Sequence, residues 1–241
     1  MNISQPNDIF TMLNNETLPP LLTDKLINPS VLFHDDFAVA GIPWSKTLGT
    51  ATVARSTTDA EWNCGGGSMK VRTSSVSAEA SELHRYHSKR PNNAGRYVFG
   101  GVFAPMDENL NNIAFYIGFR DGTNWYRAKL LHNYSANTWQ YDAGGAGAQS
   151  MVTLLTRDPS ESSTVPRWHH FMLIADLANN KYVDIRIDEH SFAKQIENTI
   201  LRQSADATFP NLLDFAIETN NNSGTPSASV IIFDKLYAFA I

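Results

Sequence analysis

The chain has 241 residues, of which 42% are hydrophobic, and a formal net charge of -5 at pH 7. This composition suits one large β domain with a buried core, and the scattered lysines and arginines argue against nucleic-acid binding. No apolar run is long enough to predict a membrane span, and the first residues lack the features of a standard secretory signal. The lone Cys64 excludes an intrachain disulfide, which is typical of a protein folded in a reducing cytoplasm.

Residues 1–30 differ from the rest of the chain. Prolines interrupt this segment, and one short helical turn is expected over Ile9 to Leu13. Its apolar residues are too few for a separate core, so we expect an extended N-terminal arm that lies across the main domain or docks on another protein chain. Buried apolar side chains dominate such contacts, and the expected anchors are Phe10, Leu13, Leu18, Leu21 and Leu22.

Residues 31–241 show the pattern of a β domain. Arg96 to Val102 is rich in Tyr, Val and Phe and predicts a strand. From Ile113 to Arg120 apolar residues alternate with Ala, Tyr, Gly and Arg, which indicates a strand with one buried face. The pair Asp121-Gly122 then predicts a turn, and Trp125 to His132 the return strand of a hairpin.

The second half of the chain continues in the same way. Trp168 to Asp176 is nearly apolar on both faces, as in a central strand, and alternation returns from Val183 to Asp188. A short helical piece is expected near Gln195 to Arg202, and Val230 to Phe239 predicts a closing core strand. About a dozen strands predict two packed antiparallel sheets.

Several of these strands carry a resemblance to a known superfamily. Arg167 to Asp176, followed by Lys181 to Asp188, is similar to the Trp-His strand and following strand of laminin-G-like and other concanavalin A-like domains. Phe33 to Phe37, Gly67 to Val71 and the closing strand resemble further strands of that fold. The order also resembles an uncharacterised family of such sandwiches in bacteria and phages. The resemblance implies an all-β, two-sheet antiparallel jelly-roll sandwich over residues 31–241, behind the arm of residues 1–30.

Aromatic and polar residues gather in the predicted hairpin after Asp121. Sugar rings stack on aromatic planes, while neighbouring amides and guanidinium groups bind their hydroxyls. The candidate glycan-binding residues are Trp125, Tyr126, Arg127, Tyr134, Trp139 and Tyr141. Because sheets are rich in aromatic residues, about half of these side chains are equally expected in the core.

Catalytic patterns of the superfamily are absent or incomplete. Retaining glycosidases need two carboxylates close together on one strand face, whereas Asp184 and Asp188 alternate with Arg186 as on a solvated sheet surface. Polysaccharide lyases of this fold carry Arg-x-Glu-Leu and Gln-x-His strands, and here the arginine and the second motif are missing. The sequence therefore predicts no enzyme. For a lyase, the residues to suspect are Glu82, His84, Arg85, Tyr126 and His132.

Metal ligands are sparse. Adjacent histidines such as His169 and His170 point to opposite faces of a strand and cannot hold one zinc ion. Structural calcium is the one cofactor considered, at Asp35, Asp36 and Asp234 on the first and last strands, because calcium prefers carboxylate oxygens.

Two hypotheses follow from these observations. In the first, the chain is a structural virion protein, such as a phage capsid decoration, fibre or tail component, whose arm joins a homo-oligomer or virion assembly. In the second, it is a glycan-binding module of a bacterial protein. A polysaccharide lyase ranks third, and neither nucleic acid nor a membrane is expected as a partner.

Overall fold

A computed structural model gives the fold, and it describes residues 30–37, 42, 44–47, 50–57, 67–74, 76, 79–87, 95–106, 110–156, 168–206, 212–221 and 229–241. Residues 1–29 of the predicted arm, with all five anchors, and Cys64 lie outside these ranges, whereas Ser30 begins the first described strand. The described residues form seventeen strands and no helix. Accordingly, no described helix is long and apolar enough to cross a membrane.

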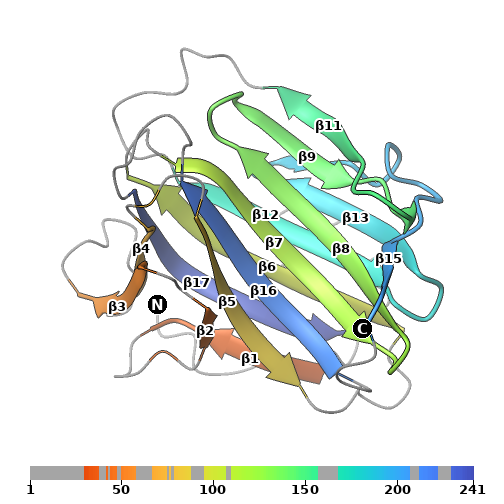
Figure 1. The fold of residues 1–241 in the computed structure, drawn as a ribbon, viewed down its shortest axis with the longest axis horizontal. Helices are drawn as coiled ribbons and strands as arrows, with labels where there is room; N and C mark the ends of the chain where they lie inside the picture. Colours follow the sequence, from red (N-terminus) through yellow and green to blue (C-terminus); the bar gives the residue numbers. More distant parts are fainter. Residues whose placement is uncertain are drawn as a thin grey trace.

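The strands form two sheets, which lie one behind the other in Figure 1. In sheet A the spatial order is β14 (His190–Ser191), β13 (Lys181–Ile187), β12 (His169–Asp176), β6 (Arg96–Pro105), β17 (Val230–Ala240), β4 (Ser68–Arg72) and β3 (Thr52–Ser56). Strand β1 (Ser30–Asp35) also pairs with β17, so the first and last described strands are neighbours.

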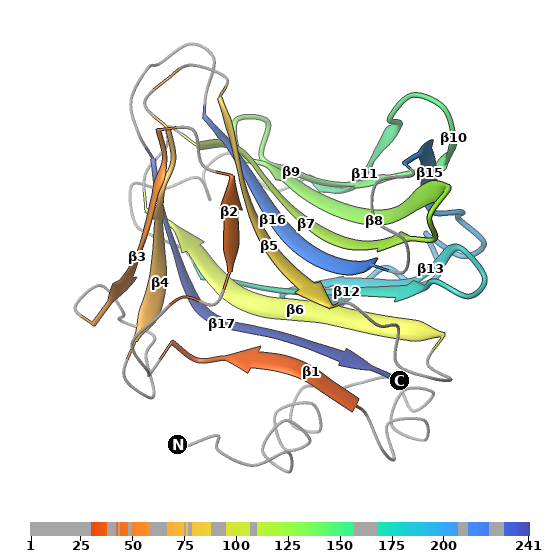
Figure 2. The ribbon, with the colours of Figure 1, turned by 60° about the horizontal axis from the view of Figure 1, so that its bottom comes forward.

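In sheet B the order is β10 (Gly145–Ala146), β15 (Arg202–Ala205), β8 (Asn124–Asn133), β7 (Leu110–Arg120), β16 (Leu212–Asn221), β5 (Ala80–His87) and β2 (Ser45–Thr47). Strand β9 (Thr138–Asp142) pairs with β8 and with β11 (Met151–Thr156). Every described pairing is antiparallel except that of β10 with β15. Figure 2 shows that sheet B is curved and that its concave face is turned away from sheet A.

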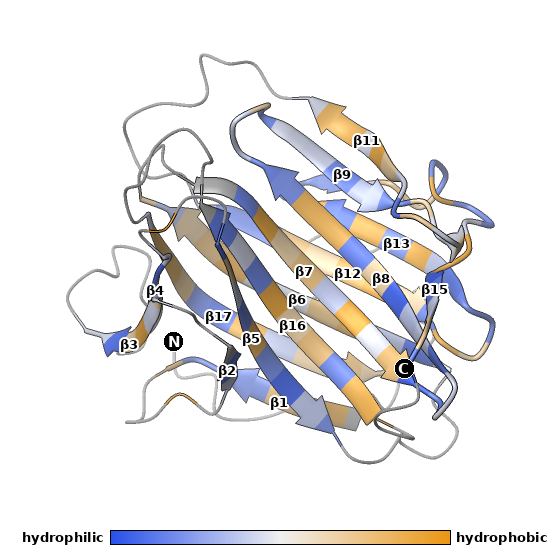
Figure 3. Cartoon of the chain, in the orientation of Figure 1, coloured by the Kyte–Doolittle hydropathy of each residue, from blue (hydrophilic) through white to orange (hydrophobic). Residues whose placement is uncertain are grey.

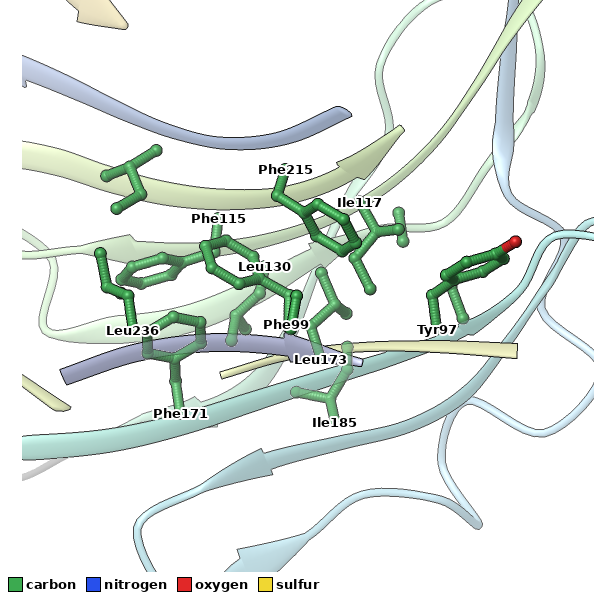
Figure 4. Close-up of a cluster of buried hydrophobic side chains, with 14 of the residues drawn as sticks. Tyr97, Phe99, Phe115, Ile117, Leu130, Phe171, Leu173, Ile185, Phe215 and Leu236 are labelled. Carbon is green, nitrogen blue, oxygen red and sulfur yellow. The ribbon is translucent and has the colours of Figure 1, made fainter. Parts of the chain in front are cut away.

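The core fills the space between the two sheets. Hydropathy alternates along β7, β8 and β16, so each strand buries one set of side chains (Figure 3). Phe99 and Phe171 of sheet A meet Phe115 and Phe215 of sheet B there, all fully buried (Figure 4). The rings of Phe115 and Phe171 stack with centroids 3.7 Å apart. Burying each such ring stabilises the fold by about 1.5–3 kcal/mol.

Strand β8 changes its neighbour on one edge. Residues 124–127 pair with β15 and residues 130–133 pair with β9. Between these two segments, the backbone N–H of Lys129 donates to the hydroxyl of Tyr182 at 2.9 Å, and that hydroxyl donates to the backbone carbonyl of Asp142 at 2.8 Å. Tyr182 lies on β13 of sheet A. One side chain from the opposite sheet therefore satisfies a backbone donor where sheet B divides.

The all-β prediction is confirmed, and the expected strands appear as β6, β7, β8, β12, β13 and β17. The prediction of a short helical piece near Gln195 to Arg202 is wrong. The segment forms turns instead, in which Gln195 N–H and Ile196 N–H both donate to the carbonyl of Phe192. Asn198 has a positive φ of 65°, which no α-helix contains.

The interpretation of Asp184 and Arg186 as solvated is also wrong. Their exposed fractions are only 2% and 9%, although they occupy the outer face of sheet A. The Nε of Arg186 donates to a carboxylate oxygen of Asp184 at 2.9 Å, and the hydroxyl of Ser191 donates to the same group. Burial is tolerated because each charge has its partner.

Candidate functional site

The outward positions of four adjacent strands form the concave face of sheet B. Because side chains alternate along a strand, the residues between the core positions of β5, β16, β7 and β8 all point to this face. Strand pairing aligns them in rows across the sheet. The face comprises Glu82, His84 and Tyr86 on β5, Asp214, Ala216 and Glu218 on β16, Ala114, Tyr116, Gly118 and Arg120 on β7, and Trp125, Arg127, Lys129 and Leu131 on β8.

Tyr116 occupies the middle of this face. Its ring packs with Ala114, Ala216 and Leu131, since small neighbours on the sheet leave room for it. Its hydroxyl donates to a carboxylate oxygen of Glu218. Burial, together with the charge of Glu218, raises the pKa of Tyr116 far above its usual value. The hydroxyl therefore stays protonated and acts as a donor.

Lys129 is the cation beside this pair. Its Nζ lies 3.9 Å from a carboxylate oxygen of Glu218 and 5.0 Å from the centroid of the Tyr116 ring. Burial lowers the pKa of Lys129, and Glu218 partly offsets that effect. The three side chains thus form one linked donor–acceptor group beneath the concave surface.

A second charged group lies on β5 and β16. His84 Nε2 is 3.0 Å from Glu82, and His84 Nδ1 is 3.2 Å from both carboxylate oxygens of Asp214. Although burial lowers the pKa of His84, the two carboxylates raise it further, to about 9, so the ring is a cation at neutral pH. Tyr86 stacks on His84 with centroids 5.1 Å apart and remains 44% exposed.

Arginine and tryptophan form the third part of the face. The Cζ atoms of Arg120 and Arg127 lie 4.4 and 4.5 Å from the Trp125 ring centroid, and Arg127 is also 5.1 Å from that of Tyr116. The indole lies across Gly118, where an added Cβ would be 2.5 Å from its Nε1. Only glycine at this position allows such a close approach.

Several buried polar atoms on this side of sheet B have no hydrogen-bond partner among the described residues. They are Trp125 Nε1, Arg127 Nε, Arg202 Nε, Asn112 Oδ1, Asn220 Oδ1 and Thr138 Oγ1. Folded proteins pair most such atoms, because an unpaired buried donor or acceptor costs about 1–3 kcal/mol. Several of them lie on the same side of sheet B, which marks this side as a region where polar groups lack partners among the described residues.

The structure separates the six predicted glycan residues. Trp125 and Arg127 lie on the concave face, whereas Trp139 is 0% exposed and Tyr141 is also buried in the core. Tyr126 packs against the core from the inward side of β8. The remaining residue, Tyr134, lies in the turn between β8 and β9. Neither Trp139 nor Tyr141 is accessible to a ligand, because β9 extends sheet B and turns both side chains inward.

The residues suspected for a lyase do not come together either. Glu82 and His84 meet on the concave face. Arg85 points the other way, with its Cζ 5.4 Å from the centroid of the core ring Phe33. His132 is buried and stacks on Trp139 with centroids 4.4 Å apart. With Tyr126 also on the inward side, the five residues occupy two faces of sheet B.

The three acids suggested for calcium do not form a cluster. Among the described residues, no group of three or more His, Cys, Asp or Glu side chains is placed to hold a metal ion. Asp35 accepts a hydrogen bond from the indole N–H of Trp44 at 2.8 Å. Asp234 is buried on β17, and burial raises its pKa to about 6.

The sequence interpretation missed Tyr86, Tyr116, Asp214 and Glu218. The alternation from Ile113 to Arg120 could have identified Tyr116, because Tyr116 lies on the opposite face of the strand from the apolar residues. The acids on β16 become neighbours of β7 only through pairing across about a hundred residues of chain. No local pattern contains that information.

Solved structures share this two-sheet arrangement. The CBM2 module of the evolved Dit of Lactobacillus casei BL23 phage J-1 is 9% identical, covers 88% of this chain and 95% of its own, and has a TM-score of 0.51. Arcelin-5, a lectin-like defense protein from Phaseolus vulgaris, is 6% identical, with 87% and 97% covered and a TM-score of 0.51. The fold is concanavalin A-like.

At these low sequence identities, the similarity between this chain and the two solved structures shows a shared fold and nothing more. No protein-family model matches the chain, and no curated protein matches it in sequence. The chemistry of the concave face must therefore be interpreted from its own residues.

Proposed function

We propose that the chain is a glycan-binding module and that an oligosaccharide lies on the concave face of sheet B. A sugar ring has apolar C–H faces and a rim of hydroxyls that both donate and accept hydrogen bonds. The observation that carries the proposal is one face with exposed aromatic surface and buried, unpartnered polar atoms. Tyr86 supplies the most accessible ring there.

The aromatic side chains of this face are held in place by contacts with charged neighbours. His84 supports the Tyr86 ring and is itself held by Glu82 and Asp214. Trp125 is fixed by two guanidinium groups. Because these side chains are already positioned, little conformational entropy is lost when a ligand binds.

The similar structures support the proposal, because one is a carbohydrate-binding module and the other is a lectin-like protein. We propose binding without catalysis, because Glu218 is engaged by both Tyr116 and Lys129. The residues of the incomplete lyase motifs also face both sides of the sheet. An assay for unsaturated products with acidic polysaccharides tests this part, and their formation would refute it.

Glycan titration of the full chain tests the binding proposal. Tyr86→Ala and Trp125→Ala are expected to weaken binding about tenfold or more, since stacked rings contribute over 1 kcal/mol each. Val31→Ala is the control, because Val31 is an exposed apolar residue on β1 of sheet A. Failure of the wild-type chain to bind any glycan of a broad array, or equal binding by all variants, would overturn the proposal.

We also propose a setting, namely a virion in which residues 1–30 bind a partner chain. The proposal is supported by the similar module from a phage Dit and by the five apolar anchors of the arm. A chain lacking residues 1–30 is expected to keep the sandwich but to fail to assemble. A truncated chain that still assembles would refute the role of the arm.

A further inference from the structure

The charges on the concave face are divided between its two sides. The carboxylates Glu82, Asp214 and Glu218 lie on β5 and β16, while the lysine and arginine side chains of this face lie on β7, β8 and β15. Most of these cations contact a carboxylate: Arg120 Nε is 2.8 Å from Asp206, Lys129 Nζ is 3.9 Å from Glu218, and Arg202 Nη1 is 3.7 Å from Asp142.

Arg127 differs from the other cations on this face. It has no carboxylate partner among the described residues, and its buried Nε has no hydrogen-bond acceptor there. The guanidinium is held between aromatic rings, at 4.5 Å from that of Trp125 and 5.1 Å from that of Tyr116. Stacking fixes the plane of the Arg127 guanidinium but gives its N–H groups no acceptor.

The neighbours of Arg127 make the lack of an anion more costly. Across the β8–β15 pairing, Arg127 stands directly opposite Arg202. Like charges at directly opposed positions destabilise a sheet, and of these two arginines only Arg202 has a carboxylate near it among the described residues, Asp142 at 3.7 Å. Arg202 Nε is also buried and without a hydrogen-bond partner.

A third donor belongs to the same row. Strand pairing aligns Gly118, Arg127 and Arg202 across β7, β8 and β15, and the Trp125 indole N–H lies over Gly118. The row thus contains three buried donors that have no hydrogen-bond partner among the described residues, namely Trp125 Nε1, Arg127 Nε and Arg202 Nε. Neither an arginine nor an indole N–H can accept a hydrogen bond, so the row is complementary to an acceptor-only group.

From this geometry we infer that the row Trp125–Arg127–Arg202 binds an anionic substituent on the sugar, so the ligand is an acidic glycan. The inference rests on the proposed glycan-binding function and specifies its ligand class. A uronic-acid carboxylate and a sulfate ester both provide paired anionic oxygens for the arginine edge. The anion also offsets the repulsion between the two opposed arginines.

Calorimetric titration of the full chain with matched pairs of oligosaccharides tests the inference. The pairs are an oligogalacturonate with its methyl ester, and a sulfated galactan fragment with its desulfated counterpart. The wild-type chain is expected to bind the acidic member of at least one pair about tenfold more tightly than the neutral member. Preference in the first pair identifies a carboxylate, and preference in the second identifies a sulfate.

Arg127→Gln and Arg202→Gln are expected to weaken binding of the acidic member much more than binding of the neutral member, and so to remove this preference. Arg96→Gln on sheet A is the matched control and should retain the full preference. Thermal melting of each variant shows whether it is folded, and the test needs only one of Arg127→Gln and Arg202→Gln to be folded. Equal wild-type binding of acidic and neutral members, or equal loss of both in the variants, would overturn the inference and leave the glycan-binding function intact. No binding of any member or of the glycan array would overturn both.

Discussion

The ion cluster around His84 has a consequence for stability at alkaline pH. The imidazolium lies between Glu82 and Asp214, at 3.0 and 3.2 Å, and its side chain is 11% exposed. Replacing His84 by Gln keeps a polar side chain of similar reach but removes the charge. The variant therefore isolates the electrostatic contribution of one ring.

The size of that contribution follows from the shift in pKa. A rise from 6.5 in the unfolded chain to about 9 in the folded one corresponds to about 3 kcal/mol of stabilisation. Because the folded value is the higher one, the stabilisation is complete below pH 6.5 and is lost as the pH rises through 9. Between these values the free energy of unfolding should fall by about 1.4 kcal/mol per pH unit.

Urea unfolding at several values between pH 6 and pH 10 measures this slope. The wild-type chain should lose stability across the window, whereas His84→Gln should start lower and change much less. His190→Gln, at an exposed histidine, is the control and should follow the wild-type curve. Parallel curves for wild type and His84→Gln, or a wild-type chain that gains stability with pH, would show that the cluster does not hold the proton as argued.

Three further predictions follow from single contacts. Trp139→Ala should lower the free energy of unfolding in urea by about 3–5 kcal/mol, because it empties a fully buried site. Trp125→Ala should lower it clearly less, and equal losses would contradict the placement of the two side chains. Asp234→Asn should stabilise the chain at pH 8 and not at pH 4, since burial raises the pKa of Asp234 to about 6 and disfavours its charged form; an equal effect at both pH values would refute this. Gly118→Ala should weaken glycan binding by displacing the Trp125 indole, and unchanged titration curves would show that the indole position is unimportant.

The sequence predicted the sheets well because strand periodicity is a local property. The alternation from Ile113 to Arg120 and the turn pair Asp121-Gly122 place β7 and β8 correctly. The same alternation could have assigned Trp139 and Tyr141 to one face, since Gln140 separates them. Which face is buried depends on how β9 continues sheet B, and that is set by pairing with β8.

The charged partners on the concave face were beyond a local interpretation. Glu82, His84 and Asp214 meet because β5 and β16 pair, although about 130 residues separate the last two. The burial of Asp184 and Arg186 was missed for a related reason. An alternating polar pattern shows which residues share a face, but not whether that face is in water.

Tyr182 reaches sheet B from behind its concave face. Its hydroxyl links the backbone N–H of Lys129 to the backbone carbonyl of Asp142, at the point where the neighbour of β8 changes from β15 to β9. The separation of those two strands, and with it the distance from Arg202 to the polar residues of β9, therefore depends on the length of one side chain in the opposite sheet. Under the proposed function, substitution of Tyr182 would change the width of the face while every side chain on that face kept its identity.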